Sequence, residues 1–444
     1  MTGDPKRIAR GTRRRGGPPR QLRHVRSRLR PITARALRQQ LHHRSLARRD
    51  LWLFNAFRLL ATSYLFVPIF MLFQADRGLS FQDRLSLGGI YSAVIVLVEV
   101  PTGVFADRIG PRRSMLLGAV AMVASCLIAA DAYSFGAFAL AEALGALSMA
   151  LCSGADSAYL FDLLLASKRV EEYPRRESIA SAWHLLGSAL AFAGGGLLAQ
   201  SDLALPYLVT AGVAAVAALI ACAMRDDQRT TTEPRRLAVR DVARVWGQQM
   251  LAALAAVARN GRLAWMVAYS AVVFVLLRAT IYVYQPYLAE RGLGTAEIGL
   301  LFAGVYLVAS IVAYRTHRLR ARLGDTLLLW GLLAVLATSF IALAGASNGP
   351  WMLALLLVQA VANGIYSPLT KPLLNAEIAD SRQRAAVLSV ESMARRAAMG
   401  IFAPLVGLYG QTDVMLLCGV VGLGGLAVLV AARCARAASP ANPD

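Results

Sequence analysis

Eight ionisable side chains lie inside long apolar segments of this sequence, and these are the residues whose types could do chemistry. They are Arg58, Glu99, Glu142, Asp156, His184, Arg278, Glu391 and Arg395. A charged side chain at the centre of a bilayer costs about 3 kcal/mol on insertion scales. Each of these residues therefore needs either a compensating partner or a role in moving protons or a substrate.

Polar residues also recur at helical spacing within five apolar segments, so that each set lies on one face of a helix. The sets are Asn55, Arg58 and Thr62; Glu142, Met149, Ser153 and Asp156; Ser181, His184 and Ser188; Arg278, Tyr282 and Gln285; and Gln359, Asn363 and Tyr366. Such faces either line an aqueous cavity or join helices by hydrogen bonds. We predict that the substrate and proton pathway contains Arg58, Glu99, Glu142, Asp156, His184, Arg278, Tyr282, Gln285, Gln359 and Asn363.

Glu99 lies about eight residues before a polar turn, or about 12 Å deep at the helical rise. It could form a neutralised structural pair with Arg58 or Arg395. Alternatively, desolvation could allow it to exchange protons during transport, and Asp156 is the second candidate for that role. A lone histidine such as His184 either titrates near neutral pH or packs as a hydrogen-bonding group.

The sequence offers no arrangement typical of an enzyme. No His, Asp or Glu set has metal-ligand spacing, and no serine, histidine and acid set indicates hydrolysis. The glycine-rich runs at Gly194 and Gly422 lie inside apolar segments and lack the lysine of a phosphate-binding loop. We therefore expect a protein that is not an enzyme, with no metal, no cofactor and no ATP drive.

The composition indicates a protein that crosses the lipid bilayer many times. The 444 residues are 57% hydrophobic and only 16% charged, and the mean hydropathy is +0.51. Apolar runs of about twenty residues predict twelve membrane helices. Their cores are 51–75, 85–106, 114–132, 135–165, 178–200, 206–224, 263–288, 296–314, 326–345, 350–374, 385–409 and 412–432. The net charge of +21 comes largely from the first fifty residues and short connectors, so we expect no nucleic-acid partner.

Charge alternates between successive connectors. "DRIGPRR", "SKRVEEYPRRE", "YRTHRLRARLGD" and "AEIADSRQR" are basic, whereas "DAYSFG", "QSDLAL", "ASNGP" and "GQTD" contain neither Lys nor Arg. Basic connectors mark the cytoplasmic side of a membrane protein. An even number of spans then predicts a multi-pass protein of the inner or plasma membrane with both termini in the cytoplasm.

The chain repeats itself, which predicts two six-helix bundles related by pseudo-symmetry. "GADSAYLFDLLL" from Gly154 aligns with "GIYSPLTKPLLN" from Gly364. Many transporters are built from such repeats, with the binding site at their interface. The predicted parts are a basic, disordered cytoplasmic tail (1–50), an N-terminal bundle (51–224), a cytoplasmic linker (225–262), a C-terminal bundle (263–434) and a cytoplasmic tail (435–444). In the second part of the linker, one helix face would carry the apolar residues Val242, Val245, Trp246 and Leu254. This part forms either an interfacial helix on the membrane or a solvated linker helix. The five cysteines lie in or beside apolar segments, and we interpret them as small apolar residues.

The turn "GVFADRIGPRR" resembles the signature loop of the major facilitator superfamily, roughly G-x-x-x-D-R-x-G-R-R/K, at the same place between the second and third spans. Gly103, Asp107, Arg108, Gly110 and Arg112 match that pattern. Pro111 departs from it, and Arg113 supplies a basic residue one position later. "EVPTG", "SGADSAYLFD", "YQPYLAERGL" and "RAAVLSVES" are similar to the bacterial proton-linked drug-exporter-like branch, over residues 51–432.

The resemblance implies an all-α fold of twelve transmembrane helices in two bundles, which moves between inward-facing and outward-facing states. It also implies a cytoplasmic latch in which Asp107 meets the start of the eleventh helix and Asp162 pairs with the basic residues of the loop. From the residues themselves, Gly103 would allow a neighbouring helix to approach and Gly110 would allow a sharp turn.

We therefore expect a monomeric secondary transporter that exports a small amphipathic organic compound in exchange for protons. Two alternatives stay open. One is proton-coupled uptake of an organic anion, with Arg58 and Arg278 as its carboxylate clamp. The other is a membrane scaffold or lipid-handling protein that does not transport.

Overall fold

The computed structural model describes residues 48–225, 239–346, 348–378, 384–409 and 414–438. Except for Arg48, everything below belongs to the unit Arg49–Asp444. The predicted basic tail falls almost wholly outside the described residues, as do residues 226–238 of the predicted linker and most of the predicted C-terminal tail.

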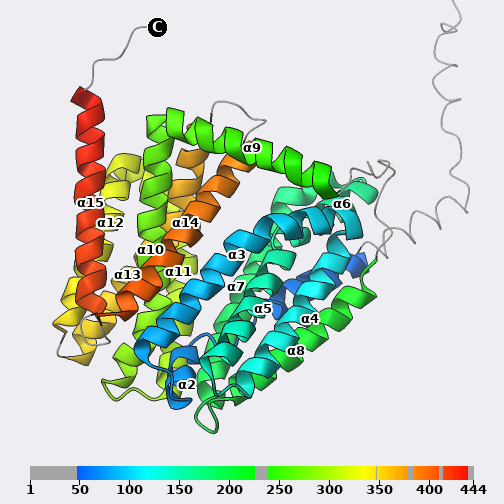
Figure 1. The fold of residues 1–444 in the computed structure, drawn as a ribbon, viewed down its shortest axis with the longest axis horizontal. Coiled ribbons are helices and arrows are strands. Elements are labelled where there is room, and N and C mark those ends of the chain that lie inside the picture. Colours follow the sequence, from blue (N-terminus) through cyan, green and yellow to red (C-terminus); the bar gives the residue numbers. More distant parts are fainter. Residues whose placement is uncertain (1–47, 226–238, 347, 379–383, 410–413, 439–444) are drawn as a thin grey trace, which may run out of the picture. The chain divides into compact units, whose positions relative to one another are not determined.

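The described chain is helical throughout, without strands (Figure 1). In the N-terminal half, residues 48–60 form the first of the described helices. It is followed by α2 (Phe70–Asp76), α3 (Phe81–Ile109), α4 (Pro111–Ala130), α5 (Phe135–Cys152), α6 (Ala155–Ala166), the short 3₁₀ helix η2 (Val170–Glu172), α7 (Tyr173–Leu198) and α8 (Leu205–Ala223). The remaining helices are α9 (Val239–Arg259), α10 (Gly261–Ala289), α11 (Thr295–Leu323), α12 (Asp325–Ala344), α13 (Gly349–Ala376), α14 (Arg384–Gly407) and α15 (Val414–Ala438).

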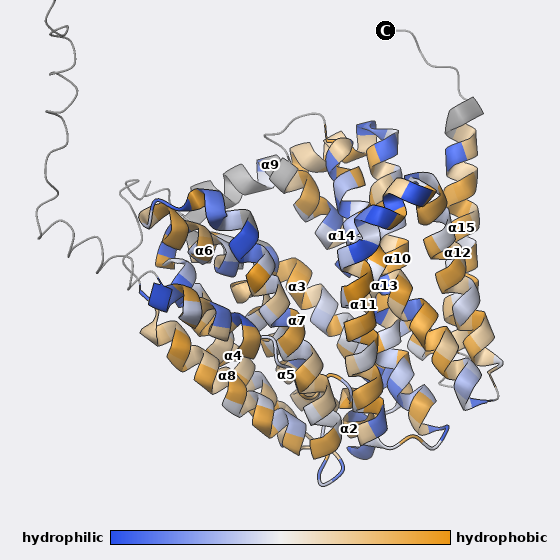
Figure 2. Cartoon of the chain, turned by 180° about the vertical axis from the view of Figure 1, so that it is seen from behind, coloured by the Kyte–Doolittle hydropathy of each residue, from blue (hydrophilic) through white to orange (hydrophobic). Residues whose placement is uncertain are grey.

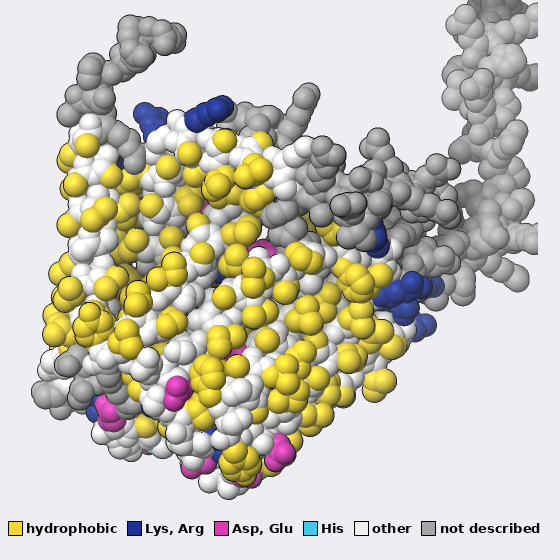
Figure 3. All heavy atoms as spheres, in the orientation of Figure 1, with side chains coloured by type: hydrophobic (Ala, Val, Ile, Leu, Met, Phe, Trp, Pro, Cys, Tyr) yellow, Lys and Arg dark blue, Asp and Glu magenta, His cyan; other side chains and the backbone are white. Residues whose placement is uncertain are grey.

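Within the described residues, ten helices are long and apolar enough to cross a membrane, counting α5 and α6 as one. The predicted all-helical, multi-pass fold is confirmed. The spans predicted at 51–75 and 385–409 are not among the ten, because the first is broken and α14 contains Glu391, Arg395 and Arg396. Figure 2 shows apolar residues along the helices and hydrophilic ones gathered near α6 and at the helix ends. Figure 3 shows Lys and Arg at the end that carries α9, with most of the visible Asp and Glu at the opposite end.

The first predicted span is not continuous. Its helix ends at residue 60, and turns occupy residues 61–69 before α2 begins. Backbone groups freed by this break would be costly inside a membrane unless side chains satisfied them. Thr210 accepts a hydrogen bond from the backbone N–H of Leu65 at 3.0 Å. Gln285 accepts from the N–H of Met71 at 2.8 Å and donates to the carbonyl of Val67 at 2.9 Å.

The predicted repeat appears in the backbone as two matching helix pairs. α3 and α11 each have 29 residues, and α4 and α12 each have 20. A single glycine joins each pair in a left-handed conformation that glycine adopts without strain, with φ of 96° at Gly110 and 77° at Gly324. The sharp turn expected at Gly110 is therefore confirmed. Pro111 is the first residue of α4, a position where its missing N–H has no helical partner to lose.

The break in the fourth span does not follow the predicted alignment of Gly154 with Gly364. Gly154, with φ of 80°, separates α5 from α6 and so interrupts the fourth span. Counted from the first residues of α5 and α13, Gly154 corresponds to Pro368, one turn beyond Gly364. The two halves therefore place a helix-disrupting residue at the same depth, although one half uses glycine and the other proline.

The two bundles contact each other along two seams related by the repeat, α3 with α14 and α11 with α7. Gly196 of α7 and Gly299 of α11 face each other so closely that a Cβ on either residue would lie 2.7 Å from the other's Cα. A Cβ on Gly89 of α3 would lie 2.7 Å from Cγ of Pro404 in α14. Both seams therefore close the interface at the end where α3 and α11 begin.

The helix α9 packs against α3, α10 and α14, near the opposite end of the bundles from α2 (Figure 1). Ala253 and Val257 are buried, whereas Leu251 is 68% exposed and Leu254 54% exposed. A helix is thus present in the second part of the predicted linker. The side chains of Val242, Val245 and Trp246, on which its predicted apolar face depended, lie outside the described residues.

Candidate transport site between the two bundles

A cavity of about 180 Å³ lies in the C-terminal half. Its walls come from α10, α11, α13 and α14, and they are Phe274, Leu277, Arg278, Thr280, Ile281, Tyr284, Phe302, Val305, Tyr306, Asn363, Tyr366 and Arg395. Aromatic rings supply much of the lining, together with two guanidinium groups. Ligand sites typically combine such apolar walls with a few polar groups.

Arg278 connects this cavity with the N-terminal half. It hydrogen-bonds to Tyr282 and interacts electrostatically with Tyr91 of α3. Glu142 of α5 interacts electrostatically with Arg278 and accepts a hydrogen bond from the Gln74 amide at 3.5 Å. The fold thus brings together Glu142, Arg278 and Tyr282, three of the residues that the sequence predicted for the pathway.

A second cation, Arg396 of α14, lies at the same interface. It approaches the sulfur of Met149 in α5 at 4.0 Å, and the Tyr91 hydroxyl donates to the same sulfur at 3.2 Å. Arg396 also interacts electrostatically with Glu99, Tyr91 and Arg278. Oε2 of Glu99 is buried and has no hydrogen-bond partner within the described part of the chain. Sequence reasoning proposed Arg58 or Arg395 as the partner of Glu99 and missed Arg396.

Arg395 has a different partner. It pairs with Glu391 one turn earlier in α14 at 2.8 Å, and its guanidinium lies over the Phe274 ring at 5.0 Å from the centroid. Glu391 also accepts a hydrogen bond from Ser270, which contacts the Tyr366 hydroxyl at 2.8 Å. Consecutive residues of a helix point about 100° apart, so Arg395 and Arg396 reach different carboxylates.

Two predicted pathway residues are hydrogen-bonded inside the protein instead of lining the cavity. Gln285 is fully buried and spans the interface to Met71 and Val67. Gln359, 2% exposed, accepts from the Tyr284 hydroxyl and donates to Ser339 at 2.9 Å. Both residues complete buried hydrogen bonds, as expected for buried polar groups.

A separate ion cluster lies in the N-terminal half. Arg58 pairs with Asp156 and also approaches Glu177 at 3.9 Å, so its partner is not Glu99. His184 interacts electrostatically with Arg58, and its backbone carbonyl accepts from Ser188 at 3.1 Å. None of these groups borders the cavity of the C-terminal half. Among the described residues, no group of three His, Cys, Asp or Glu side chains is placed to hold a metal ion.

The loop between α3 and α4 departs in part from expectation. Among the described residues, a Cβ on Gly103 would meet nothing within 4 Å, so that part of the chain shows no helix approaching at this glycine as predicted. Arg112 donates to the carbonyls of Cys222 at 2.9 Å and Met224 at 3.3 Å, at the end of α8. A cation at a helix C-terminus satisfies free carbonyls and interacts favourably with the helix dipole.

The other residues of the predicted latch are less fully described. Arg108, Arg113 and Asp162 each interact with neighbouring groups. The side chain of Asp107 lies outside the described part of the structure, so its predicted contact with α14 is not tested.

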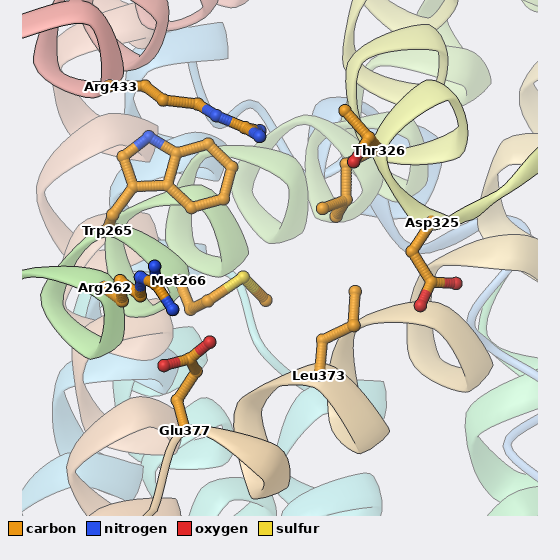
Figure 4. Close-up of a pocket in the computed structure, with 9 residues that line it drawn as sticks. Arg262, Trp265, Met266, Asp325, Thr326, Leu373, Glu377 and Arg433 are labelled. Carbon is orange, nitrogen blue, oxygen red and sulfur yellow. The ribbon is translucent and has the colours of Figure 1, made fainter. Parts of the chain in front are cut away.

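A larger cavity, of about 460 Å³, lies elsewhere in the C-terminal half, at the ends of its helices (Figure 4). It shares no lining residue with the cavity around Arg278.

The sequence of this chain matches a known protein family, and its fold is similar to those of solved structures. Residues 51–404 match the family described as Major Facilitator Superfamily. No curated protein matches the chain by sequence. Among solved structures, a mutant of the nucleoside transporter NupG has a TM-score of 0.74 at 11% identity, covering 87% of this chain and 99% of its own.

Two further solved structures share the fold. A bacterial homolog of the human lysosomal transporter Spinster, in an inward-facing and occupied conformation, has a TM-score of 0.68 at 15% identity and covers 88% of this chain and 97% of its own. The peptide transporter POT in complex with sulfate has a TM-score of 0.67 at 15% identity and covers 87% of this chain and 94% of its own. At these identities the likeness concerns the fold alone, and it confirms the predicted two-bundle architecture.

Proposed function

This chain belongs to the major facilitator superfamily and is a membrane transporter of that type; on this basis we propose that it exports a small amphipathic organic compound in exchange for protons. The observation that carries the proposal is an aromatic cavity lined by Arg278, whose guanidinium interacts with the Glu142 carboxylate of the opposite bundle.

The cavity lining supports an amphipathic substrate. The rings of Phe274, Tyr284, Phe302, Tyr306 and Tyr366 offer apolar and stacking contacts, since aromatic pairs favour offset or edge contacts beyond simple burial. The hydroxyls and the Asn363 amide offer hydrogen bonds. A volume of about 180 Å³ accommodates only part of a drug-sized molecule. We therefore expect the cavity to enlarge toward the N-terminal bundle when a substrate binds.

The charges at the interface support proton coupling, because the carboxylates belong to one bundle and the guanidiniums that they face belong to the other. Glu142 and Glu99 belong to the N-terminal bundle, and Arg278 and Arg396 belong to the C-terminal bundle. Tyr91 interacts with both arginines. Carboxylates that are ionised attract the guanidiniums across the interface, and a bound proton removes that attraction. Protonation of Glu142 or Glu99 would therefore favour separation of the two bundles where these carboxylates face the arginines.

The glycine seams support alternating access. The contacts of α3 with α14 and of α7 with α11 close one end of the interface, and glycines lie where the helices approach most closely. Such small-residue contacts can separate as rigid surfaces, whereas interlocked side chains would have to repack. We propose that these seams open in the opposite state, and that Asp107 then forms the latch with α14.

The alternative of organic-anion uptake now requires a different clamp. Arg58 is occupied by Asp156 and Glu177 and does not border the cavity. The two guanidiniums of the cavity wall are Arg278 and Arg395, and Arg395 would have to exchange its partner Glu391 for the carboxylate of the substrate. In that case protons would accompany the anion, so the direction of proton movement separates the two functions.

The sidedness of the protein is also part of the proposal. The basic connectors and α9 lie at one end, which we assign to the cytoplasm together with both termini. The exposed Leu251 and Leu254 of α9 would then contact the inner leaflet of the cell membrane. We expect the transporter to act as a monomer.

The experiment begins with purified protein and a panel of amphipathic aromatic compounds tested for thermal stabilisation. A compound that binds is then tested for counterflow, the exchange of labelled for unlabelled compound, in proteoliposomes. Saturable counterflow that the Tyr306→Ala variant weakens supports transport through the proposed cavity. Stabilisation without counterflow would indicate the scaffold or lipid-handling role instead.

A further inference from the structure

The larger cavity of the C-terminal half lies where four helices begin or end. The first turns of α10 contribute Arg262, Trp265 and Met266, and those of α12 contribute Asp325, Thr326 and Leu329. The last turns of α13 contribute Leu373 and Glu377, and α15 contributes Arg433 near its end. The cavity therefore lies at the ends of these helices, and in a bilayer we expect this end to reach the lipid headgroups.

The walls combine an apolar part with two guanidinium groups. Trp265, Met266 and Leu329 are buried, and together with Leu373 they form the apolar part. The Trp265 indole is fixed in place, because its Nε1–H donates to the Leu429 carbonyl at 2.9 Å and its ring stacks on Tyr269. Figure 4 shows the Arg433 guanidinium directed into the cavity next to this ring, with Arg262 beside Glu377 on the same wall.

The charge balance of the cavity favours an anion. Asp325 accepts two hydrogen bonds from Arg320, at 2.7 and 2.9 Å, so its charge is already neutralised. The positive charges of Arg262 and Arg433 then exceed the single negative charge of Glu377. Lys and Arg side chains lie at this end of the molecule on the face shown in Figure 3, which strengthens the attraction for anions.

We propose that this cavity binds the phosphate group of an anionic phospholipid, held between Arg262 and Arg433. The glycerol and the first carbons of the acyl chains would lie against Trp265, Met266 and Leu329. Arginine binds phosphate through charge-assisted hydrogen bonds, and basic pockets between membrane helices on the cytoplasmic side suit lipid headgroups. A soluble phosphate ester shares the headgroup chemistry but leaves the apolar wall without a contact. The site does not depend on which compound the central cavity carries.

The test measures the melting temperature of purified full-length protein in detergent with added short-chain lipids. Dioctanoyl phosphatidylglycerol should raise it with an apparent affinity at least about tenfold above that of dioctanoyl phosphatidylcholine. sn-Glycerol 3-phosphate at the same concentration should have no effect. If glycerol 3-phosphate matched phosphatidylglycerol, the lipid would be the wrong ligand. Equal stabilisation by the two lipids would refute the anionic site altogether.

Paired variants locate the site. Arg262→Gln with Arg433→Gln should abolish the preference for phosphatidylglycerol, whereas Arg262→Lys with Arg433→Lys should keep most of it. Arg315→Gln with Arg318→Gln is the matched control, because it removes two exposed charges from the tail of α11 outside the cavity. The lysine pair retains both charges, so it keeps the test valid if the glutamine pair does not fold. Loss of the preference in the control pair, or its survival in the glutamine pair, would overturn the proposal.

Discussion

Replacing Gly299 with alanine should shift the transporter away from the closed-seam state described here. The new Cβ would lie 2.6 Å from the Phe192 carbonyl oxygen and 2.7 Å from Cα of Gly196. Carbon atoms in good contact are about 3.5–4.0 Å apart, so the seam must open by several tenths of an ångström or more. Overpacking of this kind costs about 1–3 kcal/mol. Only the state with this seam closed bears the cost, so the ratio of states should change by about 5–150-fold.

A cysteine in the other seam reports this change. Leu85 of α3 is 2% exposed and packs near Gly407 of α14. After the exposed Cys222 and Cys434 are replaced with serine, the labelling rate of Leu85→Cys by a membrane-impermeant thiol reagent measures how often that seam opens. Gly299→Ala should raise the rate several-fold or more, although the substituted residue lies in α11.

The matched control is Gly304→Ala in the same helix, because a Cβ there would meet nothing within 4 Å in the described part of the chain. It should leave the labelling rate unchanged. If Gly299→Ala left the rate at the control level while both proteins kept the same melting temperature, the two seams would not open together. The account of two bundles moving as units would then be wrong.

Three further predictions concern stability in detergent. Arg112→Ala removes the cation at the end of α8 and should lower the free energy of unfolding by about 1.5–3 kcal/mol, measured by chemical denaturation. Gln285→Ala leaves the N–H of Met71 and the carbonyl of Val67 without their partner and should cost about 1–3 kcal/mol. Hydrogen bonds from Arg169 and Arg176 lower the pKa of Glu172 below its usual 4.5. The Glu172 carboxylate therefore stabilises the fold above pH 4.5, and this contribution to the free energy of unfolding disappears as the pH falls through the lowered pKa. Glu172→Gln should therefore reduce the loss of stability with falling pH below 4.5; an unchanged pH profile would show that the pair contributes nothing to folding.

The fold was predictable because its signals are local and repeated. Apolar runs of membrane-spanning length and alternating basic connectors identify the helices one at a time. The break after residue 60 was not predictable in this way. Pro68 lies within the segment, but the groups that satisfy the freed backbone are Thr210 and Gln285, far away in the sequence. A break of this kind depends on tertiary partners that hydropathy does not contain.

The candidate site was predictable by residue type but not by pairing. Helical spacing placed Arg278, Tyr282 and Asn363 on polar faces, and Arg278 and Asn363 line the cavity. The same spacing selected Gln285, which forms a buried contact between helices instead. Periodicity identifies a polar face but does not reveal whether that face meets water or another helix.

Arg396 was missed because nothing in a single helix distinguishes it from Arg395. Both follow Glu391 within α14, and the spacing of one turn favours the pair that forms, Glu391 with Arg395. The partners of Arg396 come from α3 and α5 in the other bundle. Their proximity follows from the packing of α14 against α3, which the sequence pattern did not specify.

We propose that substrate moves against protons and that Glu142, whose carboxylate interacts with Arg278 of the opposite bundle beside the cavity, links the two movements. The most direct measurement uses proteoliposomes with a pH-sensitive dye in the lumen, to which the compound that most stabilises the protein is added outside. We predict that compound entry makes the lumen more alkaline, and that Glu142→Gln abolishes this change while counterflow continues. Acidification of the lumen, or transport by the wild type with no proton movement, would contradict the account.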